Sequence, residues 1–589
     1  MTTKYFFSTI LLGIASLCAH AATIKDAGGW LESAFVEWNI DDASAAYNVY
    51  VSEAAADHWT RLDNELVRNY GSYGRADALG LSAGNYRMKV VPVSGGKENV
   101  DAAVVTEQLT VKPHDRDGFA HMGRDNSGLL EGVGAYKNDG TLKDDAIVLY
   151  ITAQNSKTLT VTWPYTTEKT KTYTGFQTIL DGYRKCRNMG GMTRPLCIRI
   201  IGTISKDDLD NSLSPQGIAV KGEAEYSELP LTIEGVGNDA TFYKFGMQVS
   251  QCQGVEIRNL GILLAIDDCV ELNKHNSHIW VHNMDLFYGQ TGSEADKVKG
   301  DGAIDIKYST DCTVAYNHFW DCGKCCLIDP SASYGTDIPA DRLTYHHNWF
   351  DHSDQRLPRC RHGKAFHVYN NYYDGNGLYG VGLASNACAF VETNWFRNCK
   401  YPVINSTSGT DRKLIDSKAS KKGLLSGEAP GACKFYNNHV EGATSFITQH
   451  NATTAHSIDA YIVATREEKI EEDYSNFDTD ATVIYQYTPT PLTDVPTLIT
   501  GQYGAGRCQK GDFSWTFDNS VEDTNCELIA PLKSALEQYT PALKAYTFNG
   551  ATSIEHLSAG TTNATIKRLN NNKVIIETQG KRYNALGQE

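Results

Sequence analysis

Beyond its first 21 residues, this 589-residue sequence has no apolar stretch long enough to span a membrane, because a transmembrane helix needs about 20 consecutive apolar residues. It also lacks a basic excess. The formal net charge is −16, which argues against nucleic-acid partners because those usually need a broad basic face. We therefore expect no transmembrane segment and no nucleic-acid binding in a chain long enough for two or three domains.

Paired metal-binding cysteine motifs are also lacking. Cys322–Cys325 is a CxxC string without a matching second half, whereas zinc sites usually show regular CxxC pairs with His spacing. Removal of Cys18 with a signal peptide leaves 14 of the 15 cysteines, an even number that favours disulfides in an oxidising compartment. The sequence leaves the pairing open, but we expect a Cys508–Cys526 bond and pairs within the cluster Cys312, Cys322, Cys325, Cys326 and Cys360.

Residues 1–21 have the pattern of a signal peptide. Lys4 supplies a charged start, 5–17 an apolar run, and Ala19-His20-Ala21 a small-residue cleavage site. The apolar run is too short for a membrane anchor. The pattern predicts a secreted protein, whether extracellular, periplasmic or on the cell surface.

Residues 22–112 are expected to form a small β-sandwich. The segments 35–38, 47–51 and 86–91 alternate apolar and polar residues at the period of a strand. Leu81–Tyr86 resembles the tyrosine-corner approach of a fibronectin type III module. Such modules are usually spacers or adaptors on carbohydrate surfaces, so we assign this domain no chemistry.

From residue 113 the sequence carries a loose repeat of short β-rich strings that end in Asn. The last Asn of each string recurs at intervals of 24, 34, 31, 23, 23 and 44 residues, and variable additions to a short base interval are typical of a β-solenoid. Asn tolerates left-handed turn geometry, and stacked amides can hydrogen-bond between coils. A β-sandwich would explain the strands but not the repeat. The seven residues are Asn259, Asn283, Asn317, Asn348, Asn371, Asn394 and Asn438.

We therefore predict an all-β chain in which the small β-sandwich precedes a right-handed parallel β-helix over 113–535. An amphipathic helix over 173–186 would cap the open end of the solenoid. Residues 451–530 would pack along the solenoid as a tail. The tail over 536–589 ends in a hairpin of 573–577 and 580–584, and it faintly resembles sorting or anchoring tails of secreted proteins.

The densest basic string is 355–363, with three arginines within six residues. Arg359 and Arg361 are two residues apart on an extended segment and should project from the same face. A run of charged residues usually forms a solvent-exposed loop. Here the run adjoins the Asn-terminated strings, so a rigid wall would present guanidinium groups that bind carboxylates bidentately.

A second string, 301–305, places Asp301 and Asp305 four residues apart, which is about 13 Å on an extended strand. A bend at Gly302 could bring the two carboxylates closer, and carboxylates that face one point bind a hard cation. Asp267 and Asp268, one coil earlier, could supply a third oxygen donor. A cation and the basic string together would also reverse locally the negative field of an acidic protein.

Several strings, in order, resemble motifs of pectate lyases of polysaccharide lyase family one over about residues 125–445. The segment 356–363 is similar to the family's R-x-P-x-x-R signature in its plant-type form, and 301–305 to its D-G-x-x-D calcium pair. Lys324–Ile328 stands where the family has its substrate-binding lysine. Ile279–His282 is similar to its W-[IV]-D-H string, but His282 and Asn283 replace the Asp.

The resemblance implies a calcium site. Asp301 and Asp305 would bind Ca²⁺, with Asp268 as the third protein ligand. This placement assumes one inserted residue between Asp268 and Trp280, so Asp267 is the open alternative.

The resemblance also implies the catalytic set. Arg356 would be the Brønsted base, Lys324 and Arg361 would hold uronate carboxylates, and Arg359 would assist. Arginine is normally always protonated in proteins, so such a base implies an alkaline pH optimum.

The expected function is that of a secreted, monomeric, calcium-dependent pectate lyase. It would cleave (1→4)-α-D-galacturonan by β-elimination and leave 4,5-unsaturated oligogalacturonides. A lyase on methyl-esterified pectin would not need the aspartate pair, and a polygalacturonase would need a carboxylic acid beside the scissile bond. A non-catalytic pectin-binding β-helix is the alternative from another class. Endo or exo action, oligomer length, esterification and surface attachment stay open.

Overall fold

The computed structural model describes residues 22–40, 46–122, 131–210, 213–293, 297–329, 342–405, 431–443 and 474–546, and the backbone of five further strands beyond residue 447. The expected signal peptide lies outside the described residues. Among the helices that are described, none has the length and apolar character needed to cross a membrane.

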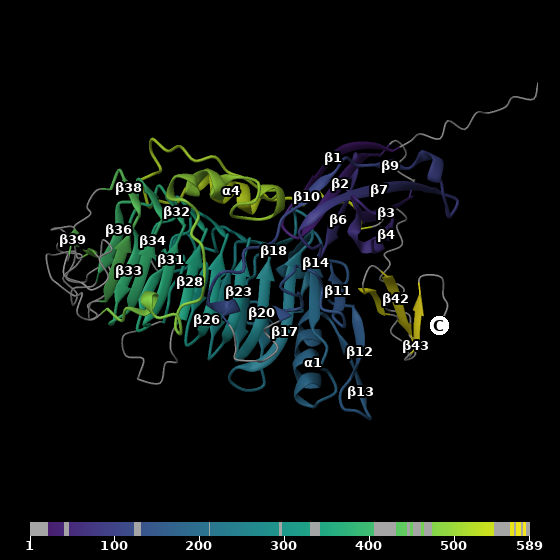
Figure 1. Cartoon of the computed structure of the whole chain (residues 1–589), viewed down its shortest axis with the longest axis horizontal. Coiled ribbons are helices and arrows are strands. Elements are labelled where there is room, and N and C mark those ends of the chain that lie inside the picture. The colour runs from purple at the N-terminus through teal and green to yellow at the C-terminus, as the bar shows by residue number, and fades with distance from the viewer. Residues whose placement is uncertain are drawn as a thin grey trace, which may run out of the picture.

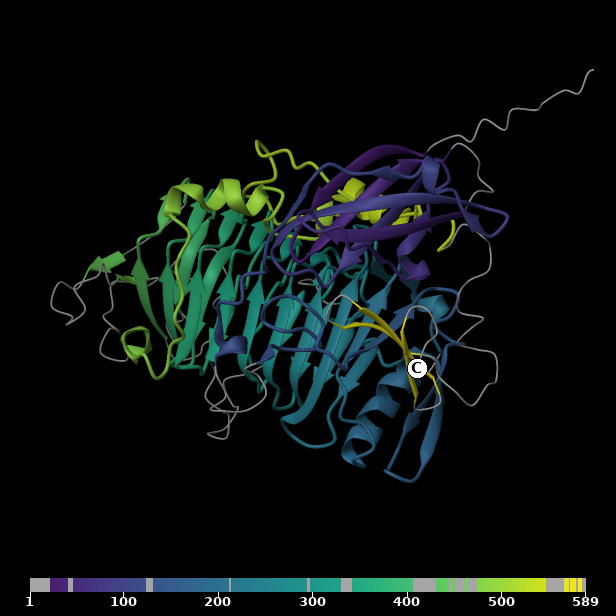
Figure 2. The ribbon, with the colours of Figure 1, turned by 45° about the vertical axis from the view of Figure 1, so that its right-hand side comes forward.

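Two antiparallel sheets form the N-terminal unit and share one apolar core, as the sequence predicts (Figures 1 and 2). Trp38 from the first sheet and Val49 and Met88 from the second are fully buried in that core. The Tyr86 hydroxyl donates to the carbonyl of Ser82 at 3.0 Å, which is the hydrogen bond of a tyrosine corner.

The first sheet has the order β1 (Thr23–Gly29), β2 (Ser33–Asn39), β6 (Tyr73–Leu79), β5 (Val67–Asn69). The second has the order β10 (Leu109–Val111), β7 (Gly84–Ser94), β3 (Ala46–Glu53), β4 (Thr60–Arg61), with β8 (Lys97–Glu98) and β9 (Val104–Val105) also paired to β7. The short helices η1 (Asn64–Leu66) and η2 (Val100–Ala102) lie in its connections.

A parallel β-helix follows, which confirms the predicted solenoid (Figure 1). Its longest sheet has ten strands in sequence order and every pair is parallel. The strands are β11 (Ile147–Ile151), β14 (Leu196–Ile200), β17 (Ser227–Gly235), β20 (Cys252–Arg258), β23 (Ser277–His282), β26 (Thr310–Ala315), β28 (Arg342–His346), β31 (Ala365–Tyr369), β34 (Cys388–Glu392) and β37 (Ala432–Tyr436).

The second face is a nine-stranded parallel sheet, and the third is divided into sheets of four and three strands. The second face consists of β15 (Thr203–Ser205), β18 (Thr241–Tyr243), β21 (Gly261–Leu263), β24 (Asp285–Leu286), β27 (His318–Trp320), β29 (Trp349–Asp351), β32 (Tyr372–Asp374), β35 (Trp395–Arg397) and β38 (His439–Glu441). The third consists of β16 (Ile218–Lys221), β19 (Met247–Ser250), β22 (Val270–Asn273) and β25 (Ile304–Ile306), then β30 (Arg359–Arg361), β33 (Tyr379–Ala384) and β36 (Tyr401–Asn405).

The side chains of each strand alternate in direction, and those that point inward fill the solenoid with apolar groups. In β23, Ile279 and Val281 belong to the main apolar core, while Trp280 and His282 point to the other side of the sheet. Because parallel pairing keeps the register, Ile279 stacks between Val255 of the coil before and Cys312 of the coil after. The core is therefore a set of apolar rows that run along the solenoid.

A row of asparagines also runs along the solenoid, as predicted, but it contains five of the seven residues. The side-chain Nδ2 of Asn317 donates to Oδ1 of Asn348, and the same bond links the following pairs at 2.9–3.1 Å. Each Oδ1 also accepts the backbone N–H of the Asn one coil earlier. The row consists of Asn317, Asn348, Asn371, Asn394 and Asn438.

The prediction is wrong for Asn259 and Asn283, which occupy a different position. In register they align with Tyr316, one residue before the row, and their φ values of 52° and 51° are left-handed. Their amides bond to backbone groups instead: Asn259 donates to the Gly235 carbonyl at 2.7 Å and accepts from the N–H of Cys508 at 2.8 Å. The left-handed turn has the same register in all these coils: Asn259 and Asn283 occupy the turn position itself, whereas in the later coils the Asn of the row follows that position by one residue.

The disulfide prediction is not supported. All 14 cysteines that the structure describes are free thiols, and 13 of them are buried. Cys312 lies in an apolar row between Ile279 and Leu343, where it acts as a small hydrophobic residue. Cys508 packs beside Trp30 in a different cluster, whereas Cys526 lies against Gly377, so the expected Cys508–Cys526 bond is wrong.

Helix α1 (Phe176–Asn188) forms where the sequence predicts it and lies at one end of the solenoid (Figure 1). Phe176, Ile179 and Tyr183 lie on one helix face and join the main core, so the helix covers the apolar end. It is preceded by the hairpin β12 (Thr160–Pro164) and β13 (Thr170–Thr174). The helices η3 (Phe119–His121) and η5 (Lys206–Asp208) are single turns.

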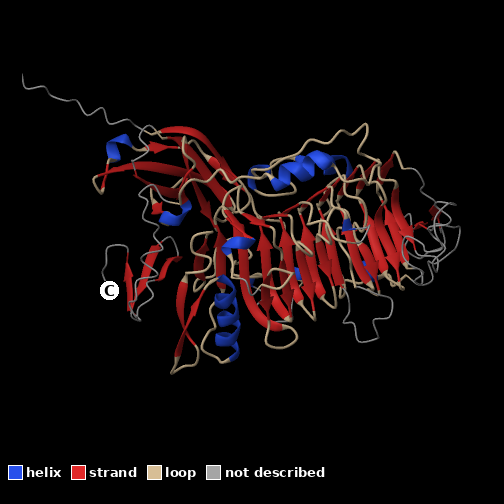
Figure 3. Ribbon diagram, turned by 180° about the vertical axis from the view of Figure 1, so that it is seen from behind, coloured by secondary structure: helices blue, strands red, loops and turns tan. Residues whose placement is uncertain are grey.

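The C-terminal segment packs back along the solenoid, as expected (Figures 1 and 3). Ile484, Val495 and Leu536 enter three separate apolar clusters with solenoid residues. Its helices are η8 (Phe477–Thr479), η9 (Leu492–Asp494), α3 (Val495–Thr500), η10 (Cys508–Lys510) and α4 (Ala530–Glu537). The strands β39 (Thr448–His450) and β40 (Tyr461–Val463) pair with each other, and β41 (Ile566–Asn570), β42 (Lys573–Thr578) and β43 (Lys581–Asn584) include the predicted hairpin.

Candidate metal-binding and catalytic site

Four consecutive coils bring the acidic and basic strings to the third face of the solenoid. Asp268 directly precedes the strand pair β22–β25, in which Glu271 is in register with Asp305. The next coil runs through Lys324, which forms a parallel bridge with Gly302, and its Leu327 forms a bridge with Arg359 of β30. This face is divided between β25 and β30, and the site residues lie at the division.

Three of the aspartates converge beside Gly302. Carboxylate oxygens of Asp267, Asp268 and Asp301 lie within 4.8 Å of one another. The backbone N–H of Gly302 donates to Asp268 Oδ1 at 2.8 Å. A Cβ atom at residue 302 would lie 2.4 Å from Asp305 Oδ1 and 2.6 Å from Asp268 Oδ1. Glycine therefore leaves room for two carboxylates to face each other.

The carboxylates differ in their electrostatic surroundings. Burial and the charge of Asp305 hold the pKa of Asp268 well above its usual value. Burial raises the pKa of Asp267, and the charge of Asp301 adds to the rise. Asp301 is the exception: burial raises its pKa, but hydrogen bonds from Lys297 and Lys324 outweigh burial and leave the pKa low. The cluster is thus an anionic site with unfavourable self-repulsion.

Ammonium groups partly compensate that repulsion. Lys324, 4% exposed, has its Nζ 3.0 Å from Asp301 Oδ1. The sequence analysis did not include Lys307, whose Nζ lies 3.4 Å from Asp268 Oδ2 and 2.8 Å from Glu271 Oε1. Lys307 could have been found, because it follows Asp305 by two residues and so projects from the same face of the strand.

The arginine string adopts the predicted alternation. Arg359 and Arg361 are each 4% exposed, while Cys360 between them is fully buried in the main core. Arg361 donates to the backbone carbonyl of Asp329. Arg356 precedes β30 in a left-handed conformation with φ of 62°, a strained geometry for a residue with a side chain.

Arg356 lies toward the acidic cluster. Burial raises the pKa of Asp305, and the charges of Lys307 and Arg356 oppose that rise. Its backbone carbonyl accepts from the N–H of Cys326 at 2.8 Å, so the neighbouring coil holds the segment. The Nε of Arg356 is buried and makes no hydrogen bond with any residue that the structure describes. A polar group buried without a partner is costly, and a catalytic role is one explanation for it.

A second lysine missed by the sequence analysis ties the loops of the site together. Lys299 is 2% exposed, and its Nζ bonds to Asp321 Oδ1 at 2.5 Å and to Asp354 Oδ1 at 2.8 Å. The three residues lie two or three positions before Asp301, Lys324 and Arg356. Burial would lower the pKa of Lys299, but the charges of Asp354 and Asp321 raise it. Only the tertiary structure brings these separate segments to one ammonium group.

The arrangement fits a hard divalent cation. All the converging donors are carboxylate oxygens, which are the ligands that calcium prefers. Their mutual repulsion would be relieved by a double positive charge. Asp267 is also held by Gln216, whose Nε2 donates to Asp267 Oδ2 at 2.9 Å. Asp267, Asp268, Asp301 and Asp305 are therefore the residues that could hold a metal here.

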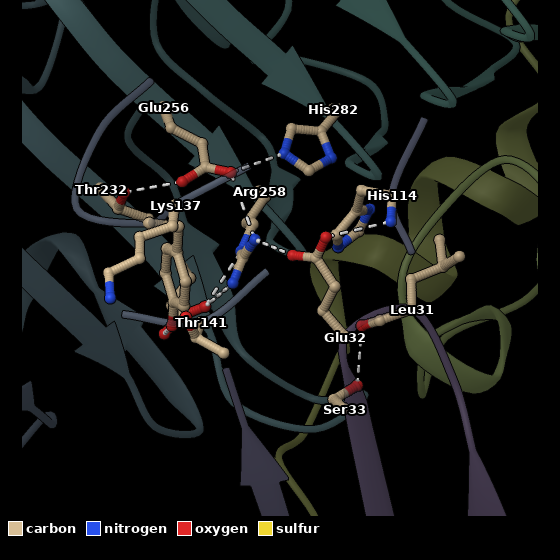
Figure 4. Close-up of polar contacts among 12 residues, drawn as sticks. Leu31, Glu32, Ser33, His114, Lys137, Thr141, Thr232, Glu256, Arg258 and His282 are labelled. Atoms are coloured by element: carbon tan, nitrogen blue, oxygen red, sulfur yellow. Dashed lines mark hydrogen bonds and ion pairs between the residues drawn. The ribbon is translucent and has the colours of Figure 1, made fainter. Parts of the chain in front are cut away.

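His282 takes part in a separate buried network on the ten-stranded sheet (Figure 4). Its Nε2 lies 3.2 Å from Glu256 Oε1, and Arg258 Nη1 lies 3.2 Å from the same oxygen. Arg258 also pairs with Glu32 of the sandwich at 3.3 Å. His282, at the strand position that departs from the family string, thus belongs to a network that reaches the sandwich through Arg258.

Residues 191–494, more than half of the chain, match a family model described as pectate lyase. The chain is 27% identical over 318 residues to Pectate lyase 3 of Pectobacterium atrosepticum, covering 52% of this chain and 76% of that protein. It is 30% identical over 289 residues to a pectate trisaccharide-lyase of a Thermotoga species, covering 47% and 71%. A solved pectate lyase of Bacillus sp. N165, in complex with trigalacturonate, aligns at 20% identity and a TM-score of 0.45, covering 67% and 99%.

Proposed function

The chain belongs to the pectate lyase family, and we propose that it is a secreted, monomeric enzyme that cleaves polygalacturonate by calcium-dependent β-elimination. One observation carries the proposal: a carboxylate cluster and a row of buried cations occupy adjoining coils, with Lys324 Nζ 3.0 Å from Asp301 Oδ1. A site of this kind pairs metal binding with recognition of an acidic sugar.

Asp268, Asp301 and Asp305 are proposed to hold Ca²⁺, with Asp267 as the alternative or additional ligand. The convergence of Asp267, Asp268 and Asp301 within 4.8 Å supports this assignment. The space left by Gly302 between Asp268 and Asp305 supports it as well. Bound calcium would neutralise a substrate carboxylate and stabilise the negative charge that develops on the sugar.

Lys324, Arg359 and Arg361 are proposed to bind uronate carboxylates. Their near-complete burial places them in a low-dielectric site, where a charge-assisted hydrogen bond is stronger than in water. The same row of cations would offset the repulsion between an acidic protein and a polyanionic chain.

Arg356 is proposed to take the proton from C5 of a galacturonate unit. The electron pair of the C5–H bond then forms the C4–C5 double bond, the C4–O bond breaks, and the leaving oxygen takes a proton. Two observations support this role. Arg356 lies beside Asp305, and the Nε of Arg356 is buried without a hydrogen-bond partner among the described residues. Arginine is protonated at neutral pH, so the rate should rise toward alkaline pH.

The test is an assay of the purified chain on polygalacturonate with and without a chelator, following the near-ultraviolet absorbance of unsaturated ends. We expect the signal to grow only with calcium and to disappear in Arg356→Ala, while that variant still binds the polysaccharide. Arg342→Ala is the matched control, because Arg342 is a partly exposed solenoid arginine that pairs with Asp311 on the ten-stranded sheet.

The other outcomes separate the alternatives. A signal on methyl-esterified pectin that persists in chelator would indicate a pectin lyase. New reducing ends without absorbance would indicate a hydrolase, and binding without either product would indicate a non-catalytic β-helix. Near-normal activity in Arg356→Ala would contradict the base assignment alone.

A further inference from the structure

A cluster of imidazole and carboxylate groups lies outside the proposed active site, where the linker after the sandwich meets the solenoid. Asp115 belongs to the linker, and His346 and His347 lie at the end of β28 on the ten-stranded sheet. Both histidines are at most 2% exposed. The Nδ1 atoms of the two rings are 2.9 Å apart, and Asp115 Oδ2 lies 3.8 Å from the first and 3.9 Å from the second.

These three distances fit one metal ion. The point equidistant from the three atoms lies about 2.1 Å from each of them, which is the length of a zinc–nitrogen or zinc–oxygen bond. Two imidazole nitrogens and one carboxylate oxygen are typical ligands of zinc and its neighbours among the divalent transition metals. Calcium, by contrast, takes oxygen ligands only.

Neighbouring groups orient two of the ligands, as in established metal sites. The Nε2 of His347 bonds to Thr490 Oγ1 at 2.9 Å, which leaves its Nδ1 facing the cluster. The other oxygen of Asp115, Oδ1, accepts from the backbone N–H of Asp117 at 2.9 Å, which turns Oδ2 toward the histidines. Tyr316 donates to Oδ2 at 3.2 Å and stacks on the ring of His347.

The ring of His346 is held by packing rather than by a hydrogen bond at its outer nitrogen. Its Nε2 is buried and has no hydrogen-bond partner among the residues that the structure describes. The ring is stacked on Tyr369 with a centroid distance of 5.0 Å, so packing fixes its orientation. Metal coordination through Nδ1 would keep the proton of the neutral ring on Nε2.

The cluster has a route to solvent. Asp115 and Tyr316 line a cavity of about 530 Å³ between the linker, the solenoid and the segment around Tyr503. Three protein ligands leave at least one coordination position, which a water molecule from the cavity can fill.

We propose that Asp115, His346 and His347 bind one divalent transition-metal ion of the zinc class, which joins the interdomain linker to the solenoid. The site is separate from the oxygen-only carboxylate cluster and does not depend on the proposed lyase activity. The cysteine pattern of the sequence does not indicate this site, because its ligands are far apart in the chain and include no cysteine.

The experiment is a calorimetric zinc titration of the full-length, chelator-stripped protein in excess Ca²⁺, which occupies oxygen-only sites. Cobalt is the second probe, because its visible d–d bands report nitrogen and oxygen ligands in a four-coordinate site. We expect about one zinc ion per chain. Asp115→Asn should weaken zinc binding by at least about 100-fold, since even outer-shell partners of a metal are worth about 10–100-fold.

Asp117→Asn is the matched control, because Asp117 lies in the same linker and contacts the cluster through its backbone, which the substitution retains. It should bind zinc as the wild type does. His346→Gln keeps the size of the side chain but removes the ligand nitrogen, and it should abolish the cobalt bands. Metal-free melting temperatures of the three variants show whether they remain folded. Absence of zinc binding in the wild type would overturn the proposal, and so would equal losses in Asp115→Asn and Asp117→Asn.

Discussion

The substitution Gly302→Ala tests the carboxylate cluster most directly. The added Cβ would lie 2.4 Å from Asp305 Oδ1 and 2.6 Å from Asp268 Oδ1, closer than the 3.0 Å that real Cβ contacts allow. Gly302 is not among the glycines with positive φ, so alanine introduces no backbone strain. The change therefore acts on the two carboxylates alone.

The magnitude follows from metal-site geometry. Each oxygen must retreat by about half an ångström, whereas metal–ligand distances tolerate only about 0.2 Å. Both aspartates are short and buried, so neither can move away freely. We expect the calcium concentration for half-maximal activity to rise by about 10–100-fold, the range found when the support of a metal ligand is disturbed. Excess calcium should restore much of the rate.

The assay is the initial rate of unsaturated-product formation as a function of calcium concentration. Gly84→Ala is the control, because Gly84 also lacks a positive φ and its Cβ would meet only Tyr86, at 3.6 Å. It should show the wild-type calcium dependence. An unchanged calcium midpoint in Gly302→Ala would refute the reasoning that Asp268 and Asp305 act together as metal ligands.

Three further substitutions test buried polar groups. Lys299→Met should lower the free energy of unfolding by about 3–5 kcal/mol, because it leaves Asp321 and Asp354 buried without a cation; an unchanged melting temperature would contradict this. Arg258→Met should cost a similar amount, and if the domains are joined there, limited proteolysis should release the sandwich faster than in the wild type. Asn371→Ala removes the acceptor of the Asn348 N–H and should cost about 1–3 kcal/mol in denaturant unfolding; a neutral effect would show that the row is not stabilising.

Local patterns were sufficient to predict the architecture. The period-two alternation predicted that Arg359 and Arg361 share a face while Cys360 points inward, and the structure confirms it. The recurring Asn predicted a solenoid with stacked amides, confirmed from Asn317 onward. These features depend on residues that are close together in the sequence, so the sequence alone predicts them.

Other predictions failed where the environment of a residue decided the outcome. The even number of cysteines and the expected oxidising compartment predicted disulfides for Cys312 and Cys360, but parallel register places them in apolar rows, where they replace an aliphatic side chain. Asn259 and Asn283 end their strings like the others, yet they lie on the left-handed turn position itself, one residue before the position that the row occupies. Register is set by the packing of whole coils, and a single string does not reveal it.

The sequence by itself determined the solenoid, the capping helix (predicted over 173–186 and found at Phe176–Asn188), and the acidic and basic strings of the proposed site. Only the tertiary structure decided which charges neutralise one another. Lys299 joins three separate segments, and Glu32 meets Arg258 across 226 positions of the chain. The physical reason is that backbone pattern is a local property, whereas the partner of a buried charge is fixed only when distant coils and domains close around it.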